Sequence, residues 1–271
     1  MSHILAISSW VAHGHVGLSA IAPVLQALGH TVTQLPTTLL SNHPGFEHAE
    51  GNATPVGTLR SIIAALEANG WLETVDTVLT GYLPSAAHVD VAIDLIERLP
   101  TARPRLVIDP VLGDHPKGLY IPREAADALR NDLVAKADII TPNLFELSWL
   151  TGRDTTTLHE TSEAARYLCS LGRLEEVIVT SPPFSGGSTG LLSVTASDVV
   201  AFETTAASQD ELVPHGVGDA FSALISAKLP TGQALGCLQA LIHSSLGAQH
   251  LRIAETAKVW TTASSISSAT V

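Results

Sequence analysis

Residues 214–229 have the sequence PHGVGDAFSALISAKL, in which a turn with two glycines leads directly into an apolar stretch. Gly216 and Gly218 can adopt backbone angles that are closed to other residues, so consecutive N–H groups can point into one concavity that suits an anion. Apolar residues recur at helical spacing from Phe221 to Leu229, which predicts a helix. The positive end of the helix dipole would lie at the same concavity.

Asp219 stands at the start of this predicted helix, where a carboxylate would repel a bound phosphate. The carboxylate has a use there if it accepts a proton from a hydroxyl group that attacks phosphorus. A second interpretation fits the local sequence equally well: Asp219 is a helix N-cap, and the glycines form an ordinary loop. The rest of the chain has to distinguish between the two.

The composition favours a globular protein with small-molecule ligands. The chain has 271 residues, 45% apolar and 15% charged, and we expect one domain over residues 1–271. A count of 14 Lys and Arg against 26 Asp and Glu gives a net charge of -12, which disfavours nucleic acid and anionic membranes as partners. A polyphosphate ligand would therefore need a helix dipole, a metal ion or a local lysine.

Several features predict a cytoplasmic protein. No apolar run is long enough to span a bilayer, and the N-terminal segment lacks the pattern of a signal peptide. Cys169 and Cys237 lie far apart in apolar contexts, so we expect reduced, buried thiols instead of a disulfide or a metal site.

Strand-like and helical patterns alternate along the chain, which predicts an α/β fold: a doubly wound, mostly parallel sheet with helices on both faces. The expected strands are residues 3–8, 31–35, 77–80, 105–109, 137–140 and 176–180, and a hairpin of 191–194 against 199–203. The expected helices are 17–28, 59–72, 85–99, 232–251 and the segments that begin near Asn143 and Asp219. We expect an irregular loop at 37–51 and a frayed tail at about 256–271.

Polar residues stand at the ends of five expected strands, where open sheets of this kind bind their ligands. Each residue alone is typical of a turn, but together with the glycine turn they predict one composite site. They are Ser8 and Ser9, Tyr82, Asp109, Thr141 with Asn143, and Thr180 with Ser181.

Asn143 and Glu146 lie three residues apart at the start of a predicted helix. Their oxygens suit a hydrated Mg²⁺ ion that bridges phosphates. The same spacing is typical of a capping box, and taken alone it favours the cap. Asp109 could order water around such an ion, and Lys117 could approach a phosphate, although a surface loop explains Lys117 equally well.

Other common sites are disfavoured. The twelve histidines, including His13 and His15, show no helical metal-binding pair and no HExxH motif, so most are expected in loops or on the surface. Phe221 stands where a third glycine would complete a dinucleotide-binding motif, and neither GxxxxGK[ST] nor GxSxG occurs.

These residues resemble the pyridoxal kinases of the ribokinase-like superfamily over nearly the whole chain. The last four of the matching blocks are shared with superfamily relatives, whereas the opening block and the SNH loop point to pyridoxal. In the family's order, the blocks are ILAISSWVAHGHVGLSA, LLSNHPGF, the GY pair at Tyr82, IDPVLGD, ITPNLFEL and GVGDAFSA.

The resemblance implies ATP-dependent phosphorylation of the 5'-hydroxymethyl group of pyridoxal, pyridoxine or pyridoxamine. It also implies Mg²⁺ and a homodimer, and it leaves a K⁺ requirement open. Asp219 would be the catalytic base, with the backbone of Gly216, Val217 and Gly218 as the anion hole.

The resemblance assigns the remaining site residues to acceptor or nucleotide. On the acceptor side, Ser9 would bond the pyridine nitrogen, Val16 and Tyr82 would pack on the ring, and the loop of His43 and Pro44 would form a small lid. On the other side, the metal and phosphates would be served by Asp109, Thr141, Asn143 and Glu146, with Asp109 and Glu146 at the metal, and the nucleotide would contact Thr180 and Ser181.

The chain departs from the family pattern at two places. Pro44 stands where the family often has threonine, which removes a hydroxyl group and an N–H donor. His215, in the segment SQDELVPHG, stands where a smaller residue is expected and can reshape the nucleotide lid. Residues 40–51 and 181–190 are the candidates for a moving element that excludes water.

Three alternatives remain at this stage. A hydroxymethylpyrimidine kinase shares the architecture, but a cysteine commonly stands at the position of Asp219 in that family. A sugar kinase is disfavoured because the opening block lacks residues that would bond several sugar hydroxyls. A non-catalytic vitamer-binding protein would not require the whole set of Asp219, the two glycines, Asn143 and Glu146.

Overall fold

A ten-stranded sheet runs through the computed structural model of the chain, which describes residues 1–100, 103–206 and 212–270. The strands from β9 to β2 are parallel, and antiparallel strands extend the sheet at both edges, which confirms the predicted doubly wound sheet. In spatial order they are β12 (Ala269–Thr270), β11 (Val199–Thr205), β10 (Ser188–Val194), β9 (Glu176–Thr180), β8 (Ile139–Ile140), β5 (Arg105–Ile108), β4 (Thr77–Thr80), β1 (His3–Val11), β2 (Thr31–Leu40) and β3 (Gly51–Ala53). β6 (Gly113–Asp114) and β7 (Gly118–Leu119) form a separate short hairpin.

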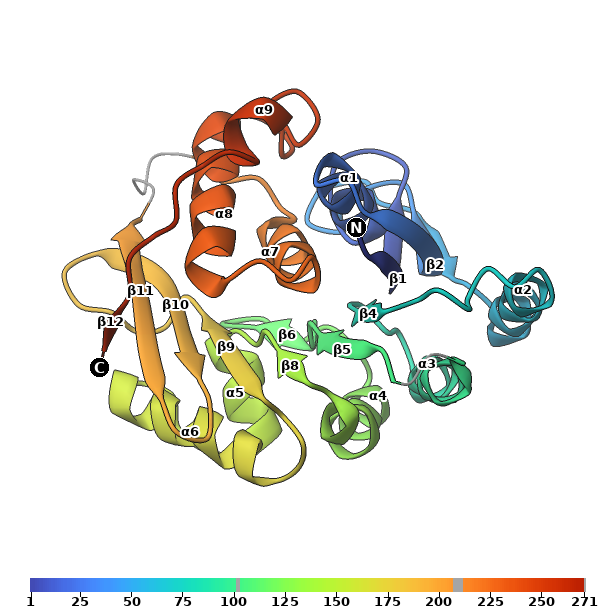
Figure 1. Cartoon of the computed structure of the whole chain (residues 1–271), viewed down its shortest axis with the longest axis horizontal. Coiled ribbons are helices and arrows are strands. Elements are labelled where there is room, and N and C mark those ends of the chain that lie inside the picture. Colours follow the sequence, from blue (N-terminus) through green and yellow to red (C-terminus); the bar gives the residue numbers. More distant parts are fainter. Residues whose placement is uncertain (101–102, 207–211, 271) are drawn as a thin grey trace.

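Helices cover both faces of the sheet, as Figure 1 shows. One face carries α1 (Leu18–Ala27), α7 (Val217–Ser226), α8 (Thr231–Ser245) and α9 (Ala257–Trp260). The other carries α2 (Val56–Ala68), α3 (Ala86–Arg98), α4 (Arg123–Ala128), a π-helical turn at Leu129–Leu133, a 3-10 turn at Val134–Lys136, α5 (Leu144–Thr151) and α6 (Leu158–Ser170). Within the described ranges, no helix has the length and apolar character needed to cross a bilayer.

The central parallel strands have continuous apolar runs because helices bury both of their faces. In β1, Ile4 and Ala6 pack with α1 and α7, whereas Leu5 and Ile7 pack on the opposite side with α2 and α3. Successive side chains of a strand point to opposite faces, so continuous burial requires a continuous apolar run.

Strand β2 is longer than the sequence indicated. The expected end was residue 35 and an irregular loop was expected from residue 37, but pairing with β1 continues to Leu40. The register shifts between Ser8 and Ser9, opposite Pro36, and the strands then resume their pairing. Proline lacks an N–H donor and is tolerated in a strand at such an irregularity, so the strand passes through a residue that normally signals its end.

The C-terminal segment is ordered, so the expectation of a frayed tail is wrong for residues 256–270. The buried indole N–H of Trp260 donates to the Ile253 carbonyl at 2.8 Å, and the Ile266 N–H donates to the Gly232 carbonyl at 2.9 Å. β12 then pairs with β11. The Ser- and Thr-rich composition of this segment gave no indication of these contacts. The last tail residue, 271, and residues 208–211 of the segment before the glycine turn lie outside the described residues.

A buried carboxylate joins the amino ends of the central strands. Asp138, directly before β8, accepts hydrogen bonds from the Leu106 N–H of β5 at 2.7 Å and from the guanidinium of Arg173, before β9, at 2.7 Å. A second guanidinium, from Arg103, also bonds it. The Asp138 side chain is 8% exposed, so these bonds form with little competition from water. This contact therefore fixes the sheet at the end opposite the polar strand ends.

We predict that Asp138→Ala lowers the free energy of unfolding by roughly 2–4 kcal/mol, because a buried N–H and two guanidinium groups lose their partner. Urea unfolding followed by circular dichroism measures the change. The matched control is Asp94→Ala, which breaks an exposed ion pair with Arg60 and should cost less than about 1 kcal/mol. Equal losses in the two variants would contradict this role of Asp138.

Candidate active site

The polar residues after the parallel strands lie side by side in the sheet. Backbone hydrogen bonds continue one residue beyond the strands: the Gly81 N–H donates to Ile7 at 2.8 Å, the Asp109 N–H to Thr80 at 2.9 Å, and the Thr141 N–H to Ile108 at 3.0 Å. Ser8 and Ser9 lie inside β1, opposite the extra residue of β2 at the register shift, since β1 runs to Val11. The expected strand-end residues thus gather at one edge of the sheet.

The glycine turn forms the N-terminus of α7. The helix begins at Val217, with Gly216 at the N-cap position in the left-handed region (φ 94). Asp219 lies inside the first helical turn, so the interpretation of Asp219 as the N-cap is wrong. The first N–H groups of a helix have no partners within it, and they carry its positive end. The turn therefore forms a helix N-terminus, as the sequence predicted, and the anion hole at this place stays a prediction.

Gly216 allows this turn to press against the loop between β1 and α1. A side chain there would lie 1.8 Å from the His15 carbonyl oxygen. Gly218, two residues on, faces the Asp109 carboxyl group, whose Oδ2 lies 3.9 Å from the position that a Cβ would take. The two glycines therefore contact opposite sides of the site.

Gly17, at the start of α1, connects two predicted site residues. Its N–H donates to the Asp219 carboxylate, and a Cβ at Gly17 would lie 2.5 Å from the Ser9 Oγ. Its φ of 56 is one that residues with side chains rarely adopt. Ser9 and Asp219 are thus brought to the same glycine, beside the partly buried Val16.

Three carboxyl groups share a region of low dielectric constant. Burial raises the pKa of Asp219 to about 6, against the effect of the Gly17 hydrogen bond. Burial and the charges of Glu146 and Asp219 raise the pKa of Asp109 well above its usual range. Burial also raises the pKa of Glu146 to about 7. A cation bound here would relieve the repulsion, because it favours the charged forms.

Asn143 and Glu146 form a capping box at α5, which confirms the structural alternative. The Asn143 side chain accepts from the Glu146 N–H, and Glu146 Oε2 accepts from the Asn143 N–H, both at 2.9 Å. Glu146 Oε1 also accepts from the Leu112 N–H at 2.8 Å, and Asn143 Nδ2 donates to the Gly113 carbonyl at 2.9 Å. The pair therefore holds the loop that follows Asp109 in place.

The other predicted nucleotide residues differ in their surroundings. Thr141 is buried, and its Oγ1 has no hydrogen-bond partner in the described part of the chain. Thr180 Oγ1 lies 3.4 Å from the Pro142 carbonyl, whereas Ser181 is exposed with a φ of 50. The exposed Lys117 lies with its Nζ 5.9 Å from the centre of the Tyr120 ring.

Tyr82 is held beside the register shift between β1 and β2. Its N–H donates to the Ser8 Oγ at 3.1 Å, and its carbonyl accepts from the Thr37 Oγ1 at 2.7 Å. Partial burial raises the pKa of its phenol, so the ring stays neutral and offers an apolar face.

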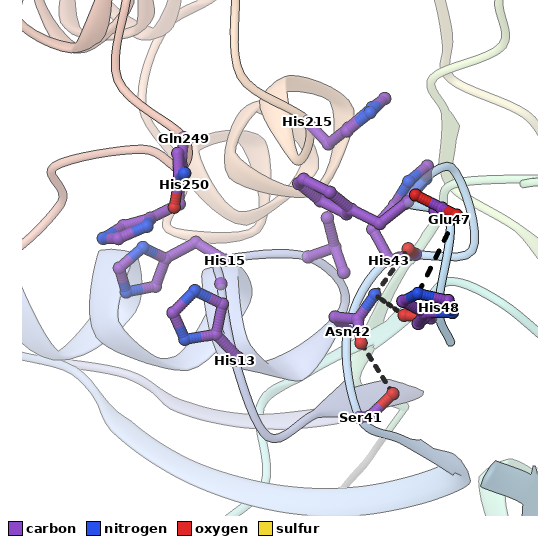
Figure 2. Close-up of a pocket in the computed structure, with 13 residues that line it drawn as sticks. His13, His15, Ser41, Asn42, His43, Glu47, His48, His215, Gln249 and His250 are labelled. Atoms are coloured by element: carbon purple, nitrogen blue, oxygen red, sulfur yellow. Dashed lines mark hydrogen bonds and ion pairs between the residues drawn. The ribbon is translucent and has the colours of Figure 1, made fainter. Parts of the chain in front are cut away.

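A cavity of about 500 Å³ opens beside the glycine turn (Figure 2). Six of its lining residues are histidines, although the sequence suggested surface positions for most of them. The HGH motif lay next to predicted site residues and could have indicated His13 and His15, but nothing local pointed to His250. Of the predicted acceptor residues, Val16 and His43 line the cavity, whereas Ser9, Pro44, Tyr82 and Asp219 do not. The lining consists of His13, Gly14, His15, Val16, Ser41, Asn42, His43, Phe46, Glu47, His48, His215, Gln249 and His250.

The chain matches a family model and named relatives over most of its length. The phosphomethylpyrimidine kinase family model matches residues 53–241. A pyridoxine/pyridoxal/pyridoxamine kinase from Bordetella avium (strain 197N) is 36% identical over 240 residues, which cover 86% of this chain and 79% of that protein.

Two solved structures match over nearly their full length. The pyridoxal kinase from Entamoeba histolytica superposes with a TM-score of 0.89 at 25% identity and covers 100% of both chains. The pyridoxal kinase from Leishmania donovani in complex with ADP and pyridoxamine gives 0.88 at 28% identity, with 97% of each chain covered. The chain therefore belongs to the pyridoxal kinases of the ribokinase-like fold.

Proposed function

We propose that this protein transfers the γ-phosphate of ATP to the 5'-hydroxymethyl group of pyridoxal, pyridoxine or pyridoxamine, a salvage reaction that yields the 5'-phosphates. The observation that carries the proposal is the Asp219 carboxyl group, held in the first turn of α7 beside an anion-binding glycine turn. Membership of the family supports the substrates, since Leishmania relatives are found in complex with ADP and with pyridoxamine or pyridoxine.

Asp219 acts as the general base in this mechanism. The acceptor oxygen forms a bond to the γ-phosphorus while the bond from that phosphorus to the bridging oxygen of ADP breaks, and the hydroxyl proton passes to Asp219. The N–H groups of Gly216, Val217 and Gly218, with the dipole of α7, stabilise the charge on the transferred group. The Gly17 N–H orients the carboxylate toward the acceptor.

The site residues fit a Mg²⁺ ion held largely through water. Among the residues that the structure describes, no three His, Cys, Asp or Glu side chains are arranged as direct metal ligands. Mg²⁺ keeps several waters in such sites and would supply charge neutralisation at the phosphates. Asp109 and Glu146 would hold its water shell, and the unpartnered Thr141 Oγ1 is free to bond water or phosphate.

The remaining residues divide between the two substrates. Asn143, Thr180 and Ser181 are assigned to ATP. Ser9 is assigned to the pyridine nitrogen, and the lining of the acceptor side is assigned to Val16, Tyr82, His43 and Pro44.

Four further features belong to the same proposal. Residues 1–271 form one kinase domain, which the continuous sheet supports. A homodimer is supported by the exposed Trp10 and Leu39, which are neighbours across β1 and β2.

The free, buried Cys169 and Cys237 fit a reducing, cytoplasmic environment. A K⁺ ion remains a candidate cofactor.

We predict that Asp219→Asn lowers kcat for pyridoxal about 100- to 10,000-fold with little change in nucleotide affinity, because it removes the general base and keeps the shape of the side chain. ADP release with Mg-ATP measures the rate, and Asp90→Asn, on the exposed side of α3, is the control. A near-normal rate in the Asp219 variant would exclude Asp219 as the general base.

The acceptor panel in this assay contains the three vitamers, hydroxymethylpyrimidine and ribose. A preference for hydroxymethylpyrimidine would overturn the substrate, and a preference for ribose would support a sugar kinase. Binding of pyridoxal without any turnover would favour a vitamer-binding protein.

The raised pKa of Asp219 also predicts an acid limit. The base works as a carboxylate, so kcat should be steady above a pH of about 6 and fall toward tenfold per unit below it. A kcat profile between pH 5 and 8.5 checks the limit. The residual activity of Asp219→Asn should not show this fall at acid pH. If the same fall persists in the variant, it belongs to another group.

We predict that Asp109→Asn raises the Mg²⁺ concentration needed for half-maximal activity about 10- to 100-fold, because a group that orders the metal's water loses its charge. Titration of activity with Mg²⁺ at constant ATP measures the shift. The control is Asp198→Asn, in the exposed turn between β10 and β11. An unchanged Mg²⁺ requirement would contradict the assignment of Asp109.

A further inference from the structure

Two stacked histidine rings fasten the loop between β2 and β3 to the glycine turn. His43, in this loop of residues 41–50, and His215, directly before Gly216, have ring centres 3.8 Å apart and planes 19° apart. Phe46 of the same loop meets the His215 ring edge-on at 6.2 Å. Figure 2 shows His215 above the loop on the side of the cavity that carries His43. The contact joins the expected lid to the turn that would bind the phosphate.

Hydrogen bonds within the loop hold its shape. Asn42 Nδ2 donates to the His43 carbonyl at 3.1 Å and to the His48 carbonyl at 3.0 Å, and Ser41 Oγ donates to Asn42 Oδ1 at 2.6 Å. The Gly45 N–H donates to His43 Nδ1 at 3.0 Å. This last bond needs a lone pair on Nδ1, so the stacked His43 ring is neutral.

We propose that His215 is a positioning residue for the acceptor: its neutral ring stacks on His43, holds the 41–50 loop over the acceptor side of the site, and releases the loop when the rings take up a proton. This inference rests on the proposed function and deepens it. His215 lies outside the chemistry itself, because its ring faces the loop and only its backbone continues into the anion-binding turn.

Protonation opposes the stack in two ways. A proton on His43 Nδ1 abolishes the bond from Gly45, and a second charge on His215 would lie only 3.8 Å from the first ring centre. Burial, then the charges of His215 and Lys117, lowers the pKa of His43 to about 4, and burial and Lys117 lower the pKa of His215. The charged and titratable groups around the stack are Lys117 between β6 and β7, Glu47 and His48 on the loop, and His13, His15 and His250 across the cavity.

The sign of the pH effect follows from the protonation of His43 in the open and in the closed form of the loop. An exposed histidine in the open loop titrates at about 6.5, whereas the closed loop holds His43 neutral down to about 4. The closed form therefore binds fewer protons, and closure weakens as the pH falls below about 6.5. Acceptor binding should weaken over the same interval, up to about tenfold per pH unit.

The test compares pyridoxal binding and turnover in wild type, His215→Ala, His215→Phe and His243→Ala at pH 7.5 and 5.5. Aromatic pairing predicts that His215→Ala raises the KM and Kd for pyridoxal about two- to twelvefold at pH 7.5, with kcat and the KM for ATP little changed. His215→Phe keeps a flat ring, so it should retain the affinity for pyridoxal at pH 7.5. It should lose less of that affinity at pH 5.5 than wild type does. His243→Ala, exposed on α8, should match wild type. The ionisation of pyridoxal itself affects binding to all four proteins equally, so it cancels when the proteins are compared.

An unchanged Kd in His215→Ala, or equal effects on ATP and pyridoxal, would overturn the proposal. Ring-proton NMR of His43 gives an independent readout: it should remain neutral well below pH 6 in wild type and titrate higher in His215→Ala, and ordinary titration in both would also overturn it. Because Kd and NMR require no turnover, a chain that binds pyridoxal without releasing ADP refutes the proposed function while the Kd comparison still decides the role of His215.

Discussion

The approach of the Gly216 turn to the His15 carbonyl is the constraint on which the site depends. No side chain fits between the two, since a Cβ on Gly216 would lie 1.8 Å from that oxygen. The approach brings α7 against the loop between β1 and α1, and this lets the Gly17 N–H reach Asp219. The proposed base, the N–H groups that would bind an anion and the residues that would hold the ring of the acceptor are therefore arranged by one backbone contact between segments far apart in the sequence.

A protein of net charge -12 must still accept a polyphosphate beside three carboxyl groups. Burial raises the pKa of Asp219 and Glu146, and burial together with the charges of those two groups raises the pKa of Asp109, so negative charge is unfavourable in that space. The positive end of α7 offsets part of this cost, and a bound cation would offset the rest. In the proposed mechanism the acid cluster would make phosphate binding depend on a metal ion, so that ATP and the ion would bind together.

The sequence predicted the sheet and most strand ends because apolar periodicity and turn residues are local signals. The limits of β4 and β9 matched the expected ones, and the hairpin of β10 and β11 pairs Val194 with Val199 as expected. Features that depend on distant partners were missed. Trp260 is buried against a carbonyl seven residues away in a polar segment, and the histidines of the cavity converge from four separate segments. Neither arrangement has a periodic signature.

The capping box at α5 shows how a motif can be structural and still serve the chemistry. Both Glu146 oxygens accept backbone N–H groups, one of them from Leu112 in the loop after β5. The same loop begins at Asp109, whose carboxyl Oδ2 lies 3.9 Å from the position that a Cβ on Gly218 of α7 would take. Glu146 therefore fixes the backbone that presents Asp109, and Asp109 in turn contacts the helix that carries Asp219. Removal of Glu146 would disturb the metal region through the backbone, even for an ion that touches only water.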